Sequence, residues 1–273
     1  MLVPMEACNQ KFYKAECNGN DFVIILKNEL IIDLNEFNIK KLCNRDLGIG
    51  SDGFILVDTS IKEFDFKMDY YNNDGTWETM CANGALCVLL VLEKNKFKFN
   101  KYQFIAGDGN HDIRYDKNNI SIKMKSPQNK TGDLNIKCYA GAHIDSGAKH
   151  FVTYCDSQDT DELFKIAQDI RFDNYFAPNG LNVNFLIVNN PNHIRVTTYE
   201  KGIEEIMLSC GSGSVAAAYY ASQKEKIHSP LKISNNGGDM ILTFDTDWNN
   251  VWLTSNPTIS FESQIDLETI NLP

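Results

Sequence analysis

The chain has 273 residues, of which 43% are hydrophobic and 23% are charged, a composition typical of a globular protein with one large or two ordinary domains. Its formal net charge of −10 argues against nucleic-acid and anionic-membrane partners, because neither surface attracts an acidic protein. No run approaches the roughly 20 apolar residues of a membrane span, and a basic-then-apolar secretory signal is lacking, so we expect a cytoplasmic protein.

The first half of the chain predicts strands and one or two helices. Short apolar or alternating segments predict strands over 22–26, 53–58 and 64–71. Asp33 and Glu36 have the spacing of a capping box and predict a helix over 34–43. Residues 104–125 predict two or three strands joined by turns, and the polar stretch 125–135 is the predicted linker.

The second half repeats this order of elements. A helix is predicted where Leu163, Ile166, Ala167 and Ile170 recur at helical spacing. Strands are predicted over 140–145, 150–155, 182–188, 193–200, 241–244, 251–254 and 258–263. The shared layout indicates two similar α/β domains, one over 1–130 and the other over 131–262, with the last strand as a candidate to pack on the first domain.

Each half also contains a cysteine where a strand-like segment turns into a helix. Cys81 lies in MCANGALC (80–87), and Cys210 lies in LSCGSGSVAAAYYA (208–221). The eight cysteines form no C-x-x-C pair and the histidines show no metal spacing, so no metal site is expected. The other cysteines are expected to be buried thiols, and His150 a structural imidazole that bonds the backbone.

The two turns share a chemistry. The first turn of a helix offers unpaired N–H groups and a partial positive charge, which bind a carboxylate and lower the pKa of a nearby thiol. Two sulfurs on opposite faces of an amino acid can invert its α-carbon, because one thiolate removes the proton and the opposite thiol supplies another. A pyridoxal cofactor would need a lysine and a phosphate cradle that the sequence does not offer, so we expect no cofactor.

Five segments resemble the diaminopimelate epimerase family, and they occur in the family's order along essentially the whole chain. They are NGNDFVII (18–25), GIGSDGFILVD (48–58), DFKMDYYNNDGTWETMCANGALC (65–87), NVNF (182–185) and YEKGIEEIMLSCGSG (199–213). The resemblance implies two pseudo-symmetric domains, each a β-barrel-like sheet around a central helix. It also implies an active site in the interdomain cleft and a cofactor-independent epimerisation of an amino acid.

The resemblance assigns roles to particular residues. Cys81 and Cys210 correspond to the two acid/base cysteines. The donors to the reacting carboxylate would be Asn83, Gly84, Gly211 and Ser212. The groups that fix the α-amine and the distal end of the substrate would be Asn20, Asn72, Asn182, Glu200 and Lys201. The predicted partner is a small amino acid, and a homodimer is compatible with the sequence.

Several positions depart from the family's usual motifs. The departures that concern the distal end of the substrate are Trp77, Leu86, Ala148 and Lys201, and lysine cannot grip a carboxylate bidentately as arginine does. These departures leave the two cysteines and their helix starts intact. The main hypothesis is a diaminopimelate epimerase, which would convert the LL to the meso isomer in the lysine and peptidoglycan pathway. The alternative is a racemase of the same mechanism for another amino acid; an isomerase of the phenazine-biosynthesis or proline-racemase type and a non-catalytic carboxylate-binding module are further alternatives.

Overall fold

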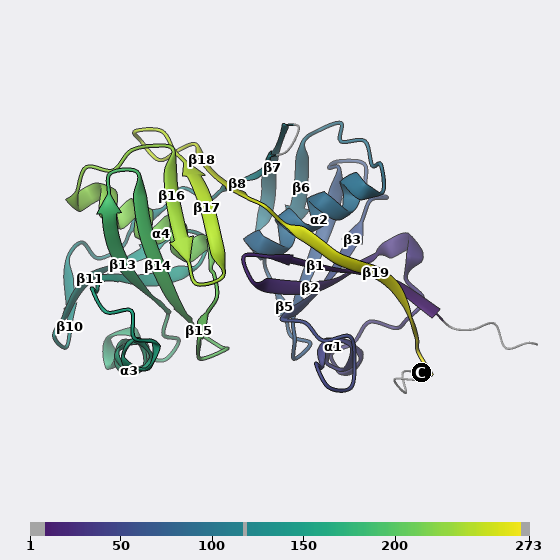
Figure 1. The fold of residues 1–273 in the computed structure, drawn as a ribbon, viewed down its shortest axis with the longest axis horizontal. Coiled ribbons are helices and arrows are strands. Elements are labelled where there is room, and N and C mark those ends of the chain that lie inside the picture. The colour runs from purple at the N-terminus through teal and green to yellow at the C-terminus, as the bar shows by residue number, and fades with distance from the viewer. Residues whose placement is uncertain (1–8, 117–118, 269–273) are drawn as a thin grey trace, which may run out of the picture. The chain divides into compact units, whose positions relative to one another are not determined.

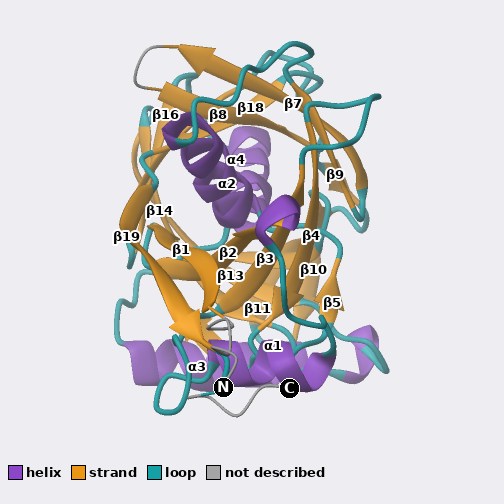
Figure 2. Cartoon of the chain, turned by 90° about the vertical axis from the view of Figure 1, so that its right-hand side faces the viewer, coloured by secondary structure: helices purple, strands orange, loops and turns teal. Residues whose placement is uncertain are grey.

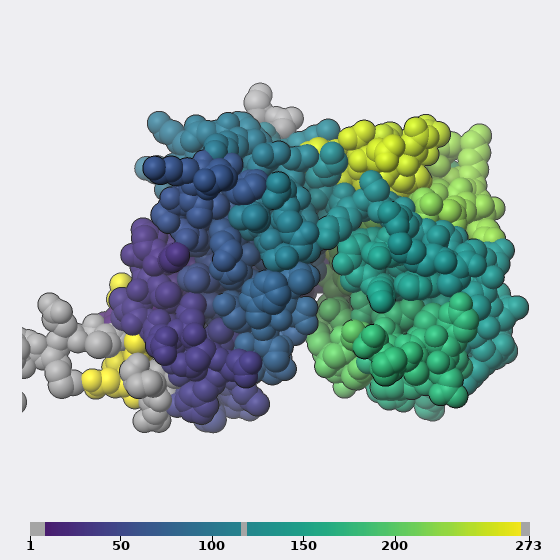
Figure 3. All heavy atoms as spheres, turned by 180° about the vertical axis from the view of Figure 1, so that it is seen from behind, coloured from purple at the N-terminus to yellow at the C-terminus, as the bar shows by residue number. Residues whose placement is uncertain are grey.

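The computed structural model describes residues 9–116 and 119–268, and they form two compact units (Figure 1). Unit 1 consists of Met1–Asp116 together with Pro257–Pro273, and unit 2 is Lys117–Asn256. Figure 3 shows yellow C-terminal residues beside the purple N-terminal part of unit 1. Among the described residues, none of the helices combines the length and the apolar character that crossing a membrane would require.

Unit 1 is a mixed sheet with one helix on either side of it. Its strands are β1 (Asn9–Cys17), β2 (Asn20–Leu26), β3 (Gly53–Asp58), β4 (Phe66–Asn72), β5 (Trp77–Glu78), β6 (Gln103–Ala106), β7 (Gly109–Asp116) and β19 (Thr258–Asp266). Its helices are the 3-10 turn η1 (Lys27–Glu29), α1 (Glu36–Cys43) and α2 (Ala82–Lys94). The order of the strands across the sheet is β19-β1-β2-β3-β4-β6-β7, with β2 parallel to β3 and β4 parallel to β6.

Unit 2 repeats this connectivity and adds strands at both ends. Its strands are β8 (Asn119–Met124), β9 (Gln128–Asn129), β10 (Leu134–Ile136), β11 (Tyr139–Asp145), β12 (Lys149–Tyr154), β13 (Asn182–Asn190), β14 (His193–Glu200), β15 (Glu205–Met207), β16 (Leu231–Asn235), β17 (Gly238–Thr243) and β18 (Val251–Ser255). Its helices are α3 (Thr160–Arg171), η2 (Asn174–Phe176) and α4 (Gly211–Lys224). The order β11-β12-β13-β14-β16-β17 matches β1-β2-β3-β4-β6-β7, with the parallel pairs at the same places. The predicted duplicated α/β fold is confirmed.

Each sheet is covered on both faces, which explains why its central strands are apolar without alternation. In β2, Phe22 through Leu26 are all buried. Val23 and Ile25 pack with Ile39 and Leu42 of α1, and Phe22 faces α2, where it lies near Gly84. In unit 2, Val183 and Phe185 of β13 pack with Leu163, Ala167 and Ile170 of α3. Strands buried on both faces read as continuous apolar runs.

The helices α2 and α4 are the central helices of their units, and in Figure 2 strands surround both of them. In α2 every residue from Ala82 to Leu89 is buried, and α4 buries most of Gly211–Ala221. A helix that is apolar on all sides is stable only when it is enclosed. The cysteine before each helix is therefore attached to a buried element of its unit.

Three local details differ from the sequence-based expectations. Helix α1 is capped by Asn35, whose side chain accepts from Asn38 N at 2.9 Å, and not by Asp33. The predicted linker 125–135 contains β9 and part of β10, and the two compact units divide at Asp116/Lys117, since β8 pairs with β18. Strand β1 was not predicted, because two of its buried residues are polar: Gln10 binds Glu29 O at 3.0 Å and Lys14 pairs with Asp21 at 2.6 Å.

Candidate active site

Cys81 and Cys210 occupy the same backbone position in the two units. Each is the residue before its central helix, with φ −131° and ψ 119° at Cys81 and φ −143° and ψ 115° at Cys210. Each carbonyl accepts the first helical hydrogen bond at 2.9 Å, from Ala85 N and from Ser214 N. The agreement of these angles and bonds makes the two cysteine turns one structural motif, present twice.

The first turns of α2 and α4 carry the predicted carboxylate donors. Asn83 and Gly84 are the second and third residues of α2, and Gly211 and Ser212 are the first and second residues of α4. The helix geometry leaves the N–H groups of such residues without a carbonyl partner in their own helix. At α4 the third N–H, from Gly213, donates to Cys210 Sγ at 3.4 Å, so the sulfur caps its own helix.

The asparagines predicted in unit 1 lie at strand ends near the start of α2. The register pairs Phe22 with Gly53 and Gly53 with Asn72, which brings the start of β2 and the end of β4 to one edge of the sheet. Asn20 begins β2, and its Oδ1 accepts from Cys81 Sγ at 3.7 Å. Asn72 ends β4 in the turn toward β5, where its Nδ2 donates to Thr76 Oγ1 at 3.3 Å.

The predicted residues of unit 2 lie at the equivalent edge. The register pairs His150 with Asn182 and Val183 with Tyr199, so Asn182 begins β13 next to the end of β14 at Glu200. Asn182 Oδ1 accepts from Lys201 N at 2.8 Å, which leaves the amide nitrogen of Asn182 available on the same side chain. Glu200 is partly buried, and Lys201 is exposed.

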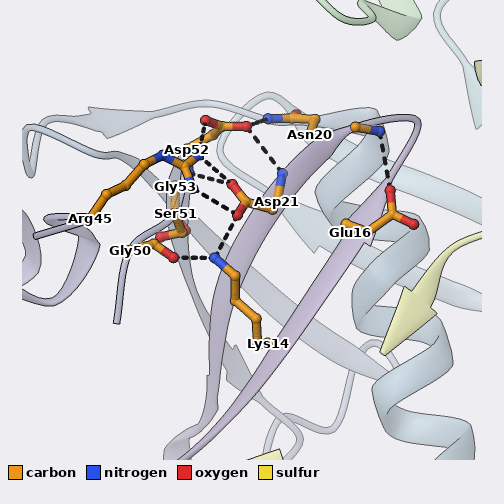
Figure 4. A network of polar contacts seen from close by, with 10 residues as sticks. Lys14, Glu16, Asn20, Asp21, Arg45, Gly50, Ser51, Asp52 and Gly53 are labelled. Carbon is orange, nitrogen blue, oxygen red and sulfur yellow. Dashed lines mark hydrogen bonds and ion pairs between the residues drawn. The ribbon is translucent and has the colours of Figure 1, made fainter. Parts of the chain in front are cut away.

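A charged network holds Asn20 in place (Figure 4). Asn20 Nδ2 donates to Asp52 Oδ2 at 3.0 Å, and Asp52 Oδ1 accepts from Arg45 at 2.7 Å. Arg45 also binds both oxygens of Asp21, at 2.9 and 3.1 Å, and Lys14 joins Asp21 at 2.6 Å. Because a carboxylate only accepts, Asn20 must turn its nitrogen to Asp52 and its oxygen to Cys81.

The surroundings of Cys210 favour the thiol. Burial, followed by the negative charge of Glu200, raises the pKa of the Cys210 thiol to about 12, although the backbone N–H groups of Gly213 and Ser212 act in the opposite direction. The expectation that the helix start lowers this pKa is wrong for Cys210, because the loss of water around the sulfur outweighs the donors of the helix. Such a sulfur is suited to supplying a proton.

His150 contacts the Cys210 turn directly, which sequence analysis missed. Its Nε2 lies 3.0 Å from Ser212 Oγ and its Nδ1 lies 2.8 Å from Asn184 Oδ1, so it bonds side chains and not the backbone as expected. Complete burial lowers the pKa of His150 to about 4, which keeps the imidazole neutral. His150 lies near the start of β12 and pairs with Asn182 of β13. Only the strand register reveals this placement, so the sequence alone could not predict it.

The turn after Glu200 is fixed by an ion pair. Arg171 of α3 binds Glu204 Oε1 at 2.9 Å, and the same carboxylate oxygen accepts from Gly202 N at 3.0 Å. Glu204 has a positive φ of 60°, which is uncommon for a residue other than glycine. The ion pair stabilises this conformation and with it the positions of Glu200 and Lys201.

The four departures from the family motifs have different structural settings. Trp77 is 49% exposed, and its ring packs so closely on Gly107 that a Cβ there would lie 2.4 Å from it. Ala148 lies in the turn before β12, partly buried. Leu86 is completely buried in α2. Of the four, only Trp77 and Lys201 are exposed side chains.

The duplicated α/β fold defines a structural class that this chain shares with several solved proteins. The structure of a probable proline racemase from Agrobacterium radiobacter K84 has a TM-score of 0.72 and 14% identity, covering 94% of this chain and 93% of that one. A phenazine biosynthesis protein from Bacillus anthracis has a TM-score of 0.67 and 13% identity, covering 94% and 99%. These likenesses concern the fold.

The sequence comparison is more specific. The profile of the family described as diaminopimelate epimerase matches residues 12–130 and 142–258. A diaminopimelate epimerase of Flavobacterium psychrophilum is 34% identical over 262 residues, which cover 93% of this chain and all of that protein. The chain belongs to the diaminopimelate epimerase family, as its motifs predicted.

Proposed function

We propose that this protein is a cofactor-independent epimerase of diaminopimelate, with Cys81 and Cys210 as its two acid/base groups. One thiolate takes the proton from the α-carbon, and the other cysteine, as a thiol, gives a proton to the opposite face. One C–H bond is broken and one is formed, so each turnover exchanges the protonation states of the two sulfurs. The matching backbone geometry of the two cysteines, each at the start of a buried helix, carries this proposal.

The remaining residues are proposed to bind and polarise the substrate. The N–H groups of Asn83, Gly84, Gly211 and Ser212 stabilise the charge that builds on the reacting carboxylate as the α-proton leaves. Asn20, Asn72, Asn182, Glu200 and Lys201 fix the amine and the distal end. We place the enzyme in the cytoplasm, where reducing conditions would keep its cysteines as thiols. We also propose a homodimer, which the largely exposed strand β19 could support through edge pairing.

Isotope exchange tests the chemistry directly. LL- or meso-diaminopimelate in deuterated buffer should gain deuterium at the α-carbon and convert to the other isomer. Cys81→Ser and Cys210→Ser should each abolish conversion, whereas Cys138→Ser, at an exposed cysteine outside the site, is the matched control. Conversion that persists in both single variants of the proposed pair would refute the mechanism.

A racemase of the same mechanism for another amino acid is the second candidate. It is favoured by Trp77 and Lys201, which are both exposed and stand where the family's motifs usually have an acidic residue and an arginine. A panel of L-amino acids in deuterated buffer distinguishes the two candidates. Exchange with diaminopimelate alone would eliminate the second one.

A further inference from the structure

A continuous chain of polar groups runs inward from Cys210 through the core of unit 2. Cys210 Sγ lies 3.5 Å from Ser212 Oγ, which lies 3.0 Å from His150 Nε2. His150 Nδ1 lies 2.8 Å from Asn184 Oδ1, and Asn184 Nδ2 donates to Thr198 Oγ1 at 2.6 Å. The exposed fractions of His150, Asn184 and Thr198 are 0%, 0% and 1%, so these three groups satisfy one another away from water.

The orientation of the Asn184 amide decides the polarity of this chain. An amide has one accepting end and one donating end, and here the oxygen faces His150. His150 must then carry its proton on Nδ1, which makes Nε2 an acceptor. The Ser212 hydroxyl then donates a hydrogen bond to Nε2, so its oxygen can only accept from Cys210 Sγ. A sulfur that faces the lone pairs of an acceptor is stabilised as the protonated thiol.

Packing prevents Asn184 from moving. Helix α4 approaches so closely at Gly213 that a Cβ there would lie 2.3 Å from Asn184 Nδ2 and 3.0 Å from Thr198 Oγ1. The amide is therefore enclosed by β12, β14 and the first turn of α4, and it binds a partner at each end. The first turn of α4 and the amide behind it form one rigid group.

We propose that Asn184 is a positioning residue that fixes the tautomer of His150 and, through the Ser212 hydroxyl, keeps Cys210 as the thiol of the cysteine pair. The role of Asn184 lies beyond the groups that touch the substrate, because it acts only through His150 and Ser212. Other charges act on the same chain: Glu200 on Cys210, and Asp145 and His143 on His150. Their charges do not choose between the two nitrogens of the imidazole, which is the specific effect of the amide.

The tautomer can be observed directly by NMR of the full chain with nitrogen-labelled histidine, assigned with His150→Gln. We expect His150 neutral with the proton on Nδ1, and we expect Asn184→Leu to move that proton to Nε2. Thr198→Val, a nearly isosteric change that removes the acceptor of Asn184 Nδ2, should give a mixture of tautomers and provides a second route if Asn184→Leu does not fold. Ser214→Ala is the matched control, since its buried hydroxyl lies on the same turn of α4 but bonds Asn235 at 3.4 Å.

The connection to proton transfer rests on the proposed function and has its own readout. In Asn184→Leu, NMR of carbon-labelled cysteine should show Cys210 losing its proton at lower pH than in the parent, and α-proton exchange should slow by about tenfold, the effect of one net hydrogen bond. A proton on Nε2 in the parent, or on Nδ1 in Asn184→Leu, would overturn the proposal. The expected tautomers in a protein that fails to epimerise would instead refute the proposed function and leave the inference about Asn184 standing.

Discussion

Replacement of Gly213 by alanine should destabilise unit 2, because the close approach of α4 to Asn184 leaves no room for a methyl group. The added Cβ would lie 2.3 Å from Asn184 Nδ2, and Asn184 is completely buried between its two hydrogen-bond partners. Overpacking of a core typically costs about 1–3 kcal/mol. Displacement of the amide adds the cost of a buried unpaired group, about 1–3 kcal/mol. Alanine recovers about 1 kcal/mol of helix propensity, so we expect a net loss of about 3 kcal/mol.

The pseudo-equivalent position in unit 1 supplies the control. Gly84 is the third residue of α2 as Gly213 is of α4, but a Cβ at Gly84 would meet the tip of a side chain, Ile55 Cδ1, at 2.7 Å and Met68 Cε at 3.4 Å. Rotation of Ile55 can relieve that contact, so Gly84→Ala should stay within about 1 kcal/mol of the parent.

Calorimetry and urea unfolding measure both variants. The two units can unfold in separate transitions, so each transition must be assigned before free energies are compared. Gly213→Ala should lower the melting temperature of unit 2 by about 10 °C. Equal melting temperatures for Gly213→Ala and Gly84→Ala would show that Asn184 is not rigidly held, and the reasoning on α4 would fail.

Three further predictions concern the turn after Glu200, the network at Asn20 and the pH dependence of stability. Glu204→Ala should leave Arg171 buried without its partner and loosen the turn that carries Lys201, which should raise KM several-fold more than it lowers kcat; steady-state kinetics would contradict this if kcat fell alone. Asp52→Asn should let the Asn20 amide reverse and slow proton exchange by about tenfold, and unchanged exchange with an intact fold would exclude a role for Asp52 in orienting Asn20. The pKa of His150 is about 4 in the folded protein and lies near 6.5 in the unfolded chain. Its contribution to the free energy of unfolding is therefore complete above pH 6.5 and is lost as the pH falls through 4. Urea titrations from pH 7 to 4 should show a loss of about 3 kcal/mol in unit 2, and His150→Gln should lack it.

The sequence was sufficient wherever a structural element depends on local pattern. The run GFILVD corresponds to β3 and HIRVTTYE to β14, both at the predicted bounds. Consecutive apolar residues in the first and alternating residues in the second indicate which side chains are buried. Helix α3 also follows its pattern, with Leu163, Ala167 and Ile170 facing the core. The cysteine turns were found in the same way, since small residues before an apolar helix are a local signal.

The sequence was insufficient where burial depends on partners far away in the chain. Lys14 occurs in a strand because Asp21 neutralises it, and no local pattern announces that pairing. The link from His150 to Ser212 spans 62 positions and the link from Asn184 to Thr198 spans 14. These contacts follow from the register of β12, β13 and β14 and from the packing of α4 on them, which the sequence does not specify.

The two cysteines share a backbone geometry but not a chemical environment, and this difference suits a reaction with two distinct faces. Cys81 contacts an amide whose orientation is imposed by the carboxylate of Asp52, whereas Cys210 contacts a hydroxyl backed by a buried imidazole. An exactly symmetric pair would share one proton without preference. Under the mechanism proposed above, unequal surroundings would place that proton on one sulfur before substrate arrives and would prepare the free enzyme for one isomer. The two cysteine turns therefore share the position of the sulfur at the helix start, while the residues behind each sulfur differ.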